Sequence, residues 1–232
     1  MSYRTGPKIV TDGLVLCLDA GDRNSYAGSG NACYDLSGGS NNGTLNSVDY
    51  SVVNNGTFSY NATSDIITVS MTNLRPTTGI TQECWFNTTS NTAQVFIGAQ
   101  YGSSSNNSYA LWINIPNSFA AGVNIGGSFN YQTQSYSILI NNWYHFIHTY
   151  NGSTQTMFLN GNTIKSWSTS GSIAYDSNNT LLAIGNDWNS GYNGGAAVAA
   201  KGNLAIARIY NRALSANEVQ QNYNATKGRF GL

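Results

Sequence analysis

The last third of the chain carries the sequence pattern that most restricts its fold. Residues 143–167 read WYHFIHTYNGSTQTMFLNGNTIKSW, which predicts three strands joined by turns at Asn151-Gly152 and Asn160-Gly161. Both central residues of a type I′ hairpin turn need a positive φ, which Asn and Gly tolerate, so both turns are predicted to be of this type. This succession indicates an all-β chain and argues against the α/β cores that many enzymes use.

One helix is predicted near the end of the chain. Ser215 and Glu218 form the S-x-x-E pattern of a capping box, in which each residue satisfies a free N–H of the other. The helix is expected to cover residues 216–225. Val219 and Tyr223 are four residues apart, so both would lie on the helix face that packs against the sheet.

The rest of the chain consists of short apolar or alternating runs separated by clusters of Gly, Asn, Ser and Asp. Such spacing is typical of a β-sandwich or barrel, and sandwiches of this length commonly form one domain. Both ends look too polar to join the core, so we expect an N-terminal arm at 1–12, a sandwich at 13–226 and a C-terminal tail at 227–232. The further strands are predicted at 13–18, 58–60, 66–70, 79–87, 95–97, 109–113, 119–125 and 136–140.

Charge and hydropathy exclude two classes of partner. Only 9% of the 232 residues are charged and the formal net charge is zero, so the chain lacks the basic stripe that neutralises nucleic-acid phosphates. No apolar run approaches the about 18 residues that cross a bilayer. The opening MSYRTGPKIV has no apolar core of a secretory signal. We therefore expect no nucleic-acid and no membrane partner.

The three cysteines are Cys17, Cys33 and Cys84. An odd number at irregular spacing does not define a disulfide framework. Cys17 and Cys84 lie in apolar strands, so they are predicted to be buried free thiols that act as small hydrophobic side chains. A metal site would need four ligands or a cluster of Cys and His, so no metal ligands are assigned.

Several motifs resemble one superfamily. W-Y-H-F at 143–146, Y-N-G at 150–152, L-N-G at 159–161 and the closing GNLAIARIYNRALS at 202–215 are similar to the laminin-G-like, concanavalin A-like lectin/glucanase superfamily. The resemblance covers about residues 13–226. It implies a concanavalin A-like jelly-roll β-sandwich of two antiparallel sheets with one short C-terminal helix.

A narrower resemblance concerns both ends of the chain. IVTDGLVL at 9–16, LDAGDRNSY at 18–26, YDLSG at 34–38 and QNYNATKGRF at 221–230 resemble virion structural proteins of tailed bacteriophages, although Cys33 stands where related sequences tend to have Trp. The resemblance implies a non-enzymatic capsid-decoration, tail or fibre component, made in the host bacterial cytoplasm and located in the virion. It would be oligomeric on the particle and bind other virion proteins, and we expect its polar ends to dock it there.

Catalytic residues are not evident. Glycosidases need two carboxylates that flank the scissile bond, and glucanases of this fold resemble E-x-D-x-x-E, a motif that this chain lacks. Its two glutamates are Glu83, alone on its strand, and Glu218 of the capping box. His145 and His148 are three residues apart on one strand, so they point to opposite faces; we expect one in the core or under a turn and the other on a solvated face. The sequence predicts no enzyme and no catalytic residue.

Four residues are candidates for ligand binding. Sugar sites stack aromatic rings on the sugar and surround it with Asn and Asp. The loop at 186–193, NDWNSGYN, has this composition through Asp187, Trp188 and Tyr192, and Tyr131 in FNYQTQ is a further exposed candidate. They support an alternative function, a carbohydrate-binding module that recognises host surface polysaccharide. The other interpretation is that Trp188 and Tyr192 fix the loop to the sandwich or contact a neighbouring subunit.

No cofactor is expected, although calcium is considered. Laminin-G-like modules often hold Ca²⁺ at a loop rim, and Ca²⁺ takes six to eight oxygen ligands. Asp19, Asp22 and Asp35 lie in two early loops and Asp187 in a late one. They lack D-x-D-x-D spacing, so the favoured interpretation is that they cap turns by accepting hydrogen bonds from nearby N–H groups.

Overall fold

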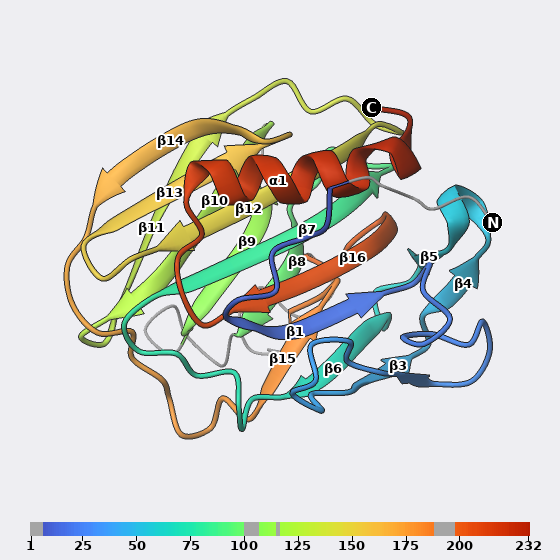
Figure 1. The fold of residues 1–232 in the computed structure, drawn as a ribbon, viewed down its shortest axis with the longest axis horizontal. Coiled ribbons are helices and arrows are strands. Elements are labelled where there is room, and N and C mark those ends of the chain that lie inside the picture. Colours follow the sequence, from blue (N-terminus) through green and yellow to red (C-terminus); the bar gives the residue numbers. More distant parts are fainter. Residues whose placement is uncertain (1–6, 100–106, 115–116, 188–197) are drawn as a thin grey trace.

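The strands form two antiparallel sheets packed face to face (Figure 1). The computed structural model describes residues 7–99, 107–114, 117–187 and 198–232. Sheet A contains, in spatial order, β14 (Asn162–Ser168), β13 (Thr154–Leu159), β12 (Trp143–Tyr150), β7 (Ile80–Thr88), β16 (Gly202–Tyr210), β5 (Thr57–Tyr60) and β4 (Asp49–Ser51), with β1 (Leu14–Asp19) also paired to β16. Sheet B contains β11 (Ser128–Ser135), β10 (Ser118–Ile125), β9 (Tyr109–Asn114), β8 (Gln94–Ala99), β15 (Leu181–Ile184), β6 (Ile66–Ser70), β3 (Gly43–Asn46) and β2 (Ala32–Cys33). The predicted all-β jelly-roll sandwich is confirmed.

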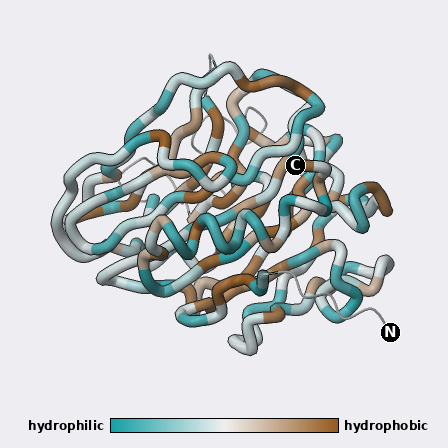
Figure 2. Tube along the Cα trace, turned by 45° about the horizontal axis from the view of Figure 1, so that its top comes forward, coloured by the Kyte–Doolittle hydropathy of each residue, from teal (hydrophilic) through white to brown (hydrophobic). Residues whose placement is uncertain are grey.

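Strand alternation builds the core between the sheets. In β7, Cys84 and Phe86 point into the main hydrophobic cluster, whereas Glu83 and Trp85 point to the opposite face. Hydrophobic segments accordingly gather in the central strands, and the surrounding loops are mostly polar (Figure 2). The three cysteines are free and buried, as predicted. Burial raises the pKa of the Cys33 thiol to about 12, so this thiol stays protonated at neutral pH.

One predicted strand is wrong, and several observed strands were not predicted, among them the short strands β2, β3 and β4, and the longer β11. Residues 136–140 form no strand, and the chain instead forms β11 at Ser128–Ser135. The apolar side chains of Tyr136, Ile138 and Ile140 suggested a strand, but this segment is the connection from β11 to β12. β11 was not predicted because most of its residues are polar. Its backbone pairing with β10 over eight residues, rather than burial, makes it a strand.

The two Asn-Gly turns differ. At the second, Asn160 and Gly161 have φ values of 49° and 81°, as a type I′ turn requires. At the first, only Gly152 has a positive φ, so the type I′ prediction is wrong there. The side chain of Asn151 instead accepts hydrogen bonds from the backbone N–H groups of Ser153 and Thr154. This Asx turn makes a longer connection between β12 and β13.

The predicted helix is α1 (Ala216–Thr226), which lies across the outer face of sheet A (Figure 1). Its capping box is present: Glu218 N donates to Ser215 Oγ, and Ser215 N donates to Glu218 Oε2. Val219 is fully buried and Tyr223 stacks on Trp85 with ring centroids 5.8 Å apart. Both sheet-facing residues are therefore confirmed. Of the helices in the described ranges, none has the length and apolar character needed to cross a membrane.

A buried ion pair lies beneath this helix. Glu83 Oε1 on β7 accepts from Arg208 Nη1 on β16 at 2.5 Å and lies 3.0 Å from His145 Nε2 on β12. Its other oxygen accepts from Asn222 Nδ2 of α1 at 2.7 Å. Burial alone would raise the pKa of Glu83, but Arg208 and the bonds from His145 and Asn222 outweigh it and lower the pKa to about 2. The carboxylate thus joins three strands to the helix.

Both ends of the chain contribute to packing, contrary to the expectation drawn from their polarity. Val10 is buried, and its N–H donates to Asn222 Oδ1 at 2.8 Å while its carbonyl accepts from Tyr210. Near the other end, η3 (Lys227–Phe230) buries Phe230 against Trp85, with ring centroids 4.2 Å apart. Val10 and Phe230, together with hydrogen bonds from their segments, attach both segments to the outer face of sheet A.

We predict that Glu83→Gln lowers the free energy of unfolding by about 3–5 kcal/mol, because it leaves Arg208 buried without its counter-charge. Urea denaturation measures this change. The exposed carboxylate of Asp49 provides the control: Asp49→Asn should stay within about 0.5 kcal/mol of the wild type.

The same pair predicts how stability depends on pH. Because folding lowers the pKa of Glu83 from 4.5 to about 2, its contribution is complete above pH 4.5 and is lost as the pH falls towards 2. The contribution changes by at most about 1.4 kcal/mol per pH unit. The Glu83→Gln variant should show a shallower slope in this window, and an equal slope would contradict the assignment.

Candidate functional site

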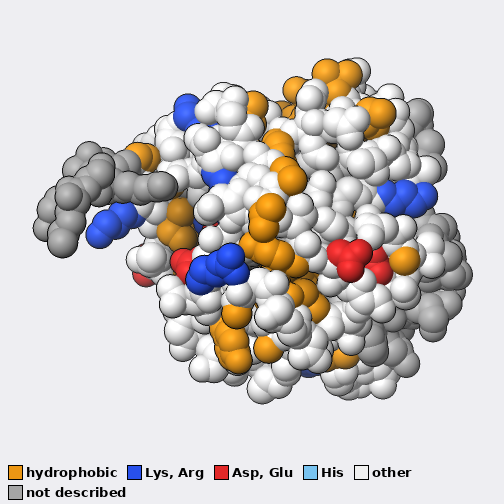
Figure 3. Space-filling model, turned by 90° about the vertical axis from the view of Figure 1, so that its right-hand side faces the viewer, with side chains coloured by type: hydrophobic (Ala, Val, Ile, Leu, Met, Phe, Trp, Pro, Cys, Tyr) orange, Lys and Arg blue, Asp and Glu red, His pale blue; other side chains and the backbone are white. Residues whose placement is uncertain are grey.

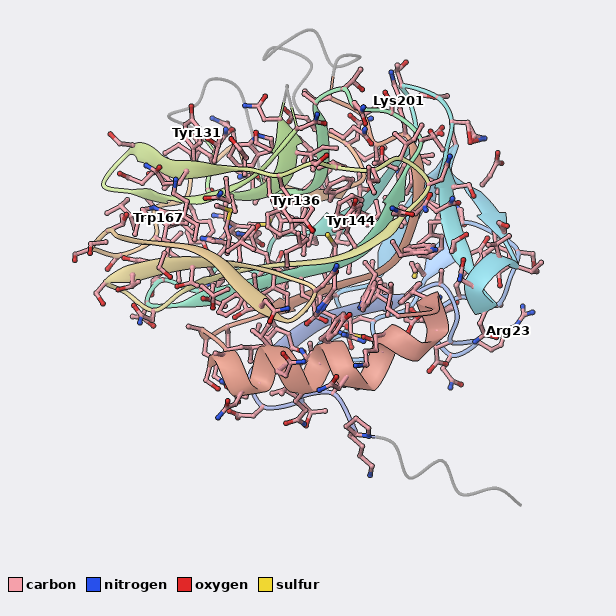
Figure 4. All side chains as sticks on the ribbon, turned by 90° about the horizontal axis from the view of Figure 1, so that it is seen from above. Arg23, Tyr131, Tyr136, Tyr144, Trp167 and Lys201 are labelled. Atoms are coloured by element: carbon pink, nitrogen blue, oxygen red, sulfur yellow. The ribbon has the colours of Figure 1, made fainter. Side chains whose placement is uncertain are left out.

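Three aromatic side chains form a cluster on the outer face of sheet B. Trp112 of β9 lies 5.5 Å from Tyr131 and 6.0 Å from Phe129, both of β11, and the last two rings are 5.9 Å apart. Tyr131 is 49% exposed, and the other two rings are half-buried. Tyr131 lies on the side of sheet B that faces away from α1, whereas Tyr144 and Trp167 lie between the sheets (Figure 4). We call Trp112, Phe129 and Tyr131 the aromatic face.

Small side chains on β10 allow these rings to meet. Ala120 lies between Trp112 and β11, and Gly122 is opposite Tyr131. Because these outward-pointing residues of β10 are small, rings from the two neighbouring strands come together above it. A Cβ atom on Gly122 would lie 2.6 Å from Tyr131 Cβ and would also collide with the carbonyl oxygen of Asn130. Gly122 therefore permits the close approach of β11.

The aromatic face has no charge of its own. The sequences of β9, β10 and β11, YALWIN, SFAAGVNI and SFNYQTQS, contain no Asp, Glu, Lys or Arg. The side of the molecule drawn in Figure 3, around β3 and β4 and away from β11, carries Lys, Arg, Asp and Glu side chains in a few separate groups. An exposed aromatic surface beside Thr, Gln and Asn suits an uncharged ligand that has both an apolar face and hydroxyl groups.

A second candidate is a polar cleft of about 800 Å³ between the end of β1, η1 (Val53–Asn55) and the end of α1. Arg229 crosses it: Nη1 donates to Asp19 Oδ1 at 2.6 Å, Nε to the carbonyl of Asn54 at 2.6 Å, and Nη2 to the carbonyl of Gly56. These bonds already join three segments of the fold. The described lining includes no aromatic ring, so the cleft is less suited than the aromatic face to stacking a sugar.

The structure separates the predicted ligand-binding residues. Tyr131 belongs to the aromatic face, and it is exposed, as predicted from the sequence. Asp187 follows β15 and is buried, and three strands, β10, β9 and β8, lie between β11 and β15. With strands about 4.8 Å apart, the two residues are not neighbours. Trp188 and Tyr192 lie outside the described residues.

Sequence reasoning missed two members of the aromatic face. Phe129 is two residues before Tyr131, so strand alternation would have placed both rings on one face had β11 been recognised. Trp112 gives no such signal. It meets Tyr131 only because β9 and β11 flank β10 in a particular register, and the sequence of one chain does not reveal that register.

The early aspartates stabilise loops, as the turn-capping interpretation predicts. Asp35 Oδ1 accepts from Cys17 N at 2.8 Å, and its Oδ2 accepts from the Ser37 hydroxyl at 2.7 Å. Asp19 Oδ1 accepts from Gly21 N as well as from Arg229. Among the described residues, no three His, Cys, Asp or Glu side chains are grouped closely enough to hold a metal ion.

The two glutamates and two histidines are engaged in the fold. Glu83 is buried beneath α1, and Glu218 pairs with Arg212 at 2.6 Å. His145 and His148 point to opposite faces of sheet A, as predicted, but both are buried. The expectation of a solvated histidine is wrong because α1 and the stacked ring of Trp85 cover His145.

The chain belongs to the concanavalin A-like lectin/glucanases superfamily, whose family model matches residues 61–220. The matched region includes the whole aromatic face. No curated protein matches the sequence.

Solved structures with the same fold are distant in sequence. The receptor-binding domain of botulinum neurotoxin C/D mosaic serotype superposes with a TM-score of 0.69 at 16% identity, covering 92% of this chain and 51% of that chain. The binding domain of Paraclostridial Mosquitocidal Protein 1 gives 0.69 at 16% identity, with 92% and 52% covered. This chain thus spans about half of each toxin domain.

A third structure matches over nearly its full length. Domain 4 of AbnA, an extracellular GH43 arabinanase from Geobacillus stearothermophilus solved in complex with arabinotriose, superposes with a TM-score of 0.67 at 14% identity. The match covers 90% of this chain and 98% of that domain. At these identities the likenesses establish the fold alone.

We predict that Gly122→Ala disturbs the aromatic face, because the new methyl group forces β11 away from β10. The free energy of unfolding should fall by about 1–3 kcal/mol, and the near-ultraviolet circular dichroism of the aromatic cluster should change. Gly228→Ala is the control, since a Cβ there meets no atom within 4 Å. Equal spectra for the two variants would contradict the packing described.

Proposed function

We propose that the chain is a non-catalytic carbohydrate-binding module that contacts a neutral polysaccharide through the aromatic face. The observation that carries this proposal is the partly exposed, uncharged group formed by Trp112, Phe129 and Tyr131, of which Tyr131 is the most exposed. Membership of a lectin/glucanase superfamily supports it. A same-fold domain of an arabinanase was solved with arabinotriose, which supports the choice of a sugar ligand.

The aromatic face offers two kinds of contact to a sugar. The C–H groups on one side of a pyranose or furanose ring are apolar, so this side can stack on the exposed ring of Tyr131. The Tyr131 hydroxyl and the adjacent Thr133, which is opposite Ala120 on the same face, can exchange hydrogen bonds with sugar hydroxyls. Such a site would discriminate against charged sugars because no counter-charge is present on its strands.

The proposal of a non-catalytic role follows from where the carboxylates lie. Glycoside hydrolysis needs an acid and a base or nucleophile on either side of one glycosidic bond. Glu83 is held in a buried ion pair on the outer face of sheet A, and Glu218 serves the capping box. The aromatic face is on the outer face of sheet B, whose strands β9, β10 and β11 supply no carboxylate.

A second proposal is that the module is part of a bacteriophage virion, where it decorates the capsid or forms part of a tail or fibre. The resemblance of the sequence near both ends to phage structural proteins supports it. Apolar side chains that remain exposed, including Val52 at 75% and Leu139 at 57%, favour contact with another protein. The two proposals are compatible, since a virion protein can bind host glycans.

Mass spectrometry of purified phage particles tests the virion proposal. A peptide signal from this chain at a copy number comparable to that of a capsid or tail protein is expected. Particles that lack the chain, although the infected cell contains it, would contradict the proposal.

The carbohydrate proposal predicts binding on a glycan array of neutral bacterial and plant polysaccharides, arabinan included, measured with and without calcium. Tyr131→Ala should weaken the best ligand at least tenfold, about 1.4 kcal/mol, because the stacking ring is lost. Tyr34→Ala is the matched control: Tyr34 is 53% exposed and follows β2, at the opposite edge of sheet B. Absence of binding to every neutral glycan in both conditions would refute the proposal.

A further inference from the structure

We propose that Gln155, His148 and Lys165 are positioning residues that reach across the sandwich to hold β11, and with it Phe129 and Tyr131, in place for the ligand. This inference rests on the proposed carbohydrate-binding function. It concerns side chains on sheet A, none of which belongs to the aromatic face.

β11 needs such support because it lacks apolar anchors. It is the edge strand of sheet B within the described ranges, with β10 as its neighbour. A sandwich strand normally buries the side chains that point inward, but the inward-pointing residues of β11 are all polar. They lie opposite the core residues Val123, Ala121 and Phe119 of β10 and are Asn130, Gln132 and Gln134. The apolar side chains of β11, Phe129 and Tyr131, point outward instead.

A line of hydrogen bonds crosses from sheet A to this strand. Gln82 Nε2 is 2.9 Å from His148 Nδ1, and His148 Nε2 is 3.0 Å from Gln155 Oε1. Gln155 Nε2 then donates to the carbonyl oxygen of Asn130 in β11 at 3.3 Å. The line begins on β7, passes through β12 and β13, and ends at the residue between Phe129 and Tyr131.

The hydrogen bond from Gln155 to Asn130 determines which atom donates and which accepts in the other two bonds. Because the amide nitrogen of Gln155 donates to Asn130, the amide oxygen of Gln155 must accept from His148 Nε2–H. His148 Nδ1 is then the acceptor for Gln82 Nε2. This arrangement requires neutral imidazole, and burial lowers the pKa of His148 to about 3, so the neutral form is present at physiological pH.

Lys165 provides a second tether. Its Nζ atom, on β14, donates to the carbonyl oxygen of Thr133 in β11 at 2.8 Å. Asn130 precedes Tyr131 by one residue, and Thr133 follows it by two. The two tethers therefore bracket the most exposed ring of the aromatic face.

Packing alone would not require these polar groups. His148, Gln82 and Gln155 are fully buried, and Trp167 stacks on His148 with ring centroids 5.8 Å apart. Apolar side chains of similar volume would fill the same space without the cost of removing amides and imidazole from water. They could not, however, bind the backbone carbonyl of a strand that offers no apolar side chain to the core. Holding β11 is a function that only hydrogen-bond donors can perform here.

Gln155→Met and Lys165→Met test the proposal, with Thr156→Val as the matched control. Thr156 neighbours Gln155 on β13, but its hydroxyl bonds to Ser166 and its side chain points away from β11. Amide hydrogen exchange measured by mass spectrometry should be at least tenfold faster in β11 for each Met variant and unchanged there for the control. Affinity for arabinotriose, or for the best ligand of the glycan array, should fall three- to tenfold in the Met variants.

A pair of substitutions at His148 separates positioning from packing. His148→Leu fills the space without hydrogen bonds and should speed β11 exchange and weaken binding. His148→Gln supplies one donor and one acceptor again and should restore both towards wild type.

Unchanged β11 exchange in both Met variants, or wild-type affinity despite faster exchange, would overturn the inference. Lys165 is only half-buried, so its variant remains a folded test if a Gln155 variant does not fold. The exchange measurement needs no ligand. A wild-type protein that binds no neutral glycan would therefore refute the proposed function, while β11 exchange would still report on the tethers.

Discussion

The buried ion pair between Glu83 and Arg208 anchors α1 on the outer face of sheet A. Two charges buried under α1 are stable only as a pair with further hydrogen bonds, and Asn222 supplies one of these from the helix itself. The helix, the N-terminal segment around Val10 and the aromatic stack on Trp85 then cover the central part of the outer face of sheet A. The proposed sugar contact is therefore on the outer face of sheet B.

On sheet B the aromatic face depends on the absence of large outward-pointing side chains on β10. Ala120 and Gly122 leave space above β10, and rings from β9 and β11 fill part of it. The strand that carries Phe129 and Tyr131 is polar on its inner side, so its position depends on pairing with β10 and on bonds from sheet A. A strand whose aromatic side chains fill the core between the sheets would point them inward. β11 places them outward, which is the arrangement expected of a binding surface.

Local sequence signals predicted the local structure well. The capping box of Ser215 and Glu218 and the turn at Asn160-Gly161 depend on neighbouring residues alone, and both are present. The type I′ prediction at Asn151-Gly152 failed for a local reason, the Asx turn of Asn151, whereas the failures at β11 and His145 occurred where tertiary contacts decide. β11 is a strand because of its partner, although its composition is polar, and His145 is buried because a distant helix covers it. For the same reason Tyr131 could be chosen from its sequence context, whereas Trp112 joins it only through cross-strand register.

We propose that a neutral sugar binds at the aromatic face. Nuclear magnetic resonance titration of isotope-labelled protein with arabinotriose, or with the tightest neutral oligosaccharide found, tests it most directly. The largest shifts are expected at the indole N–H of Trp112 and the amides of Phe129 and Tyr131. Shifts centred instead on the cleft around Asp19 and Arg229, with the aromatic face unperturbed, would contradict the proposal.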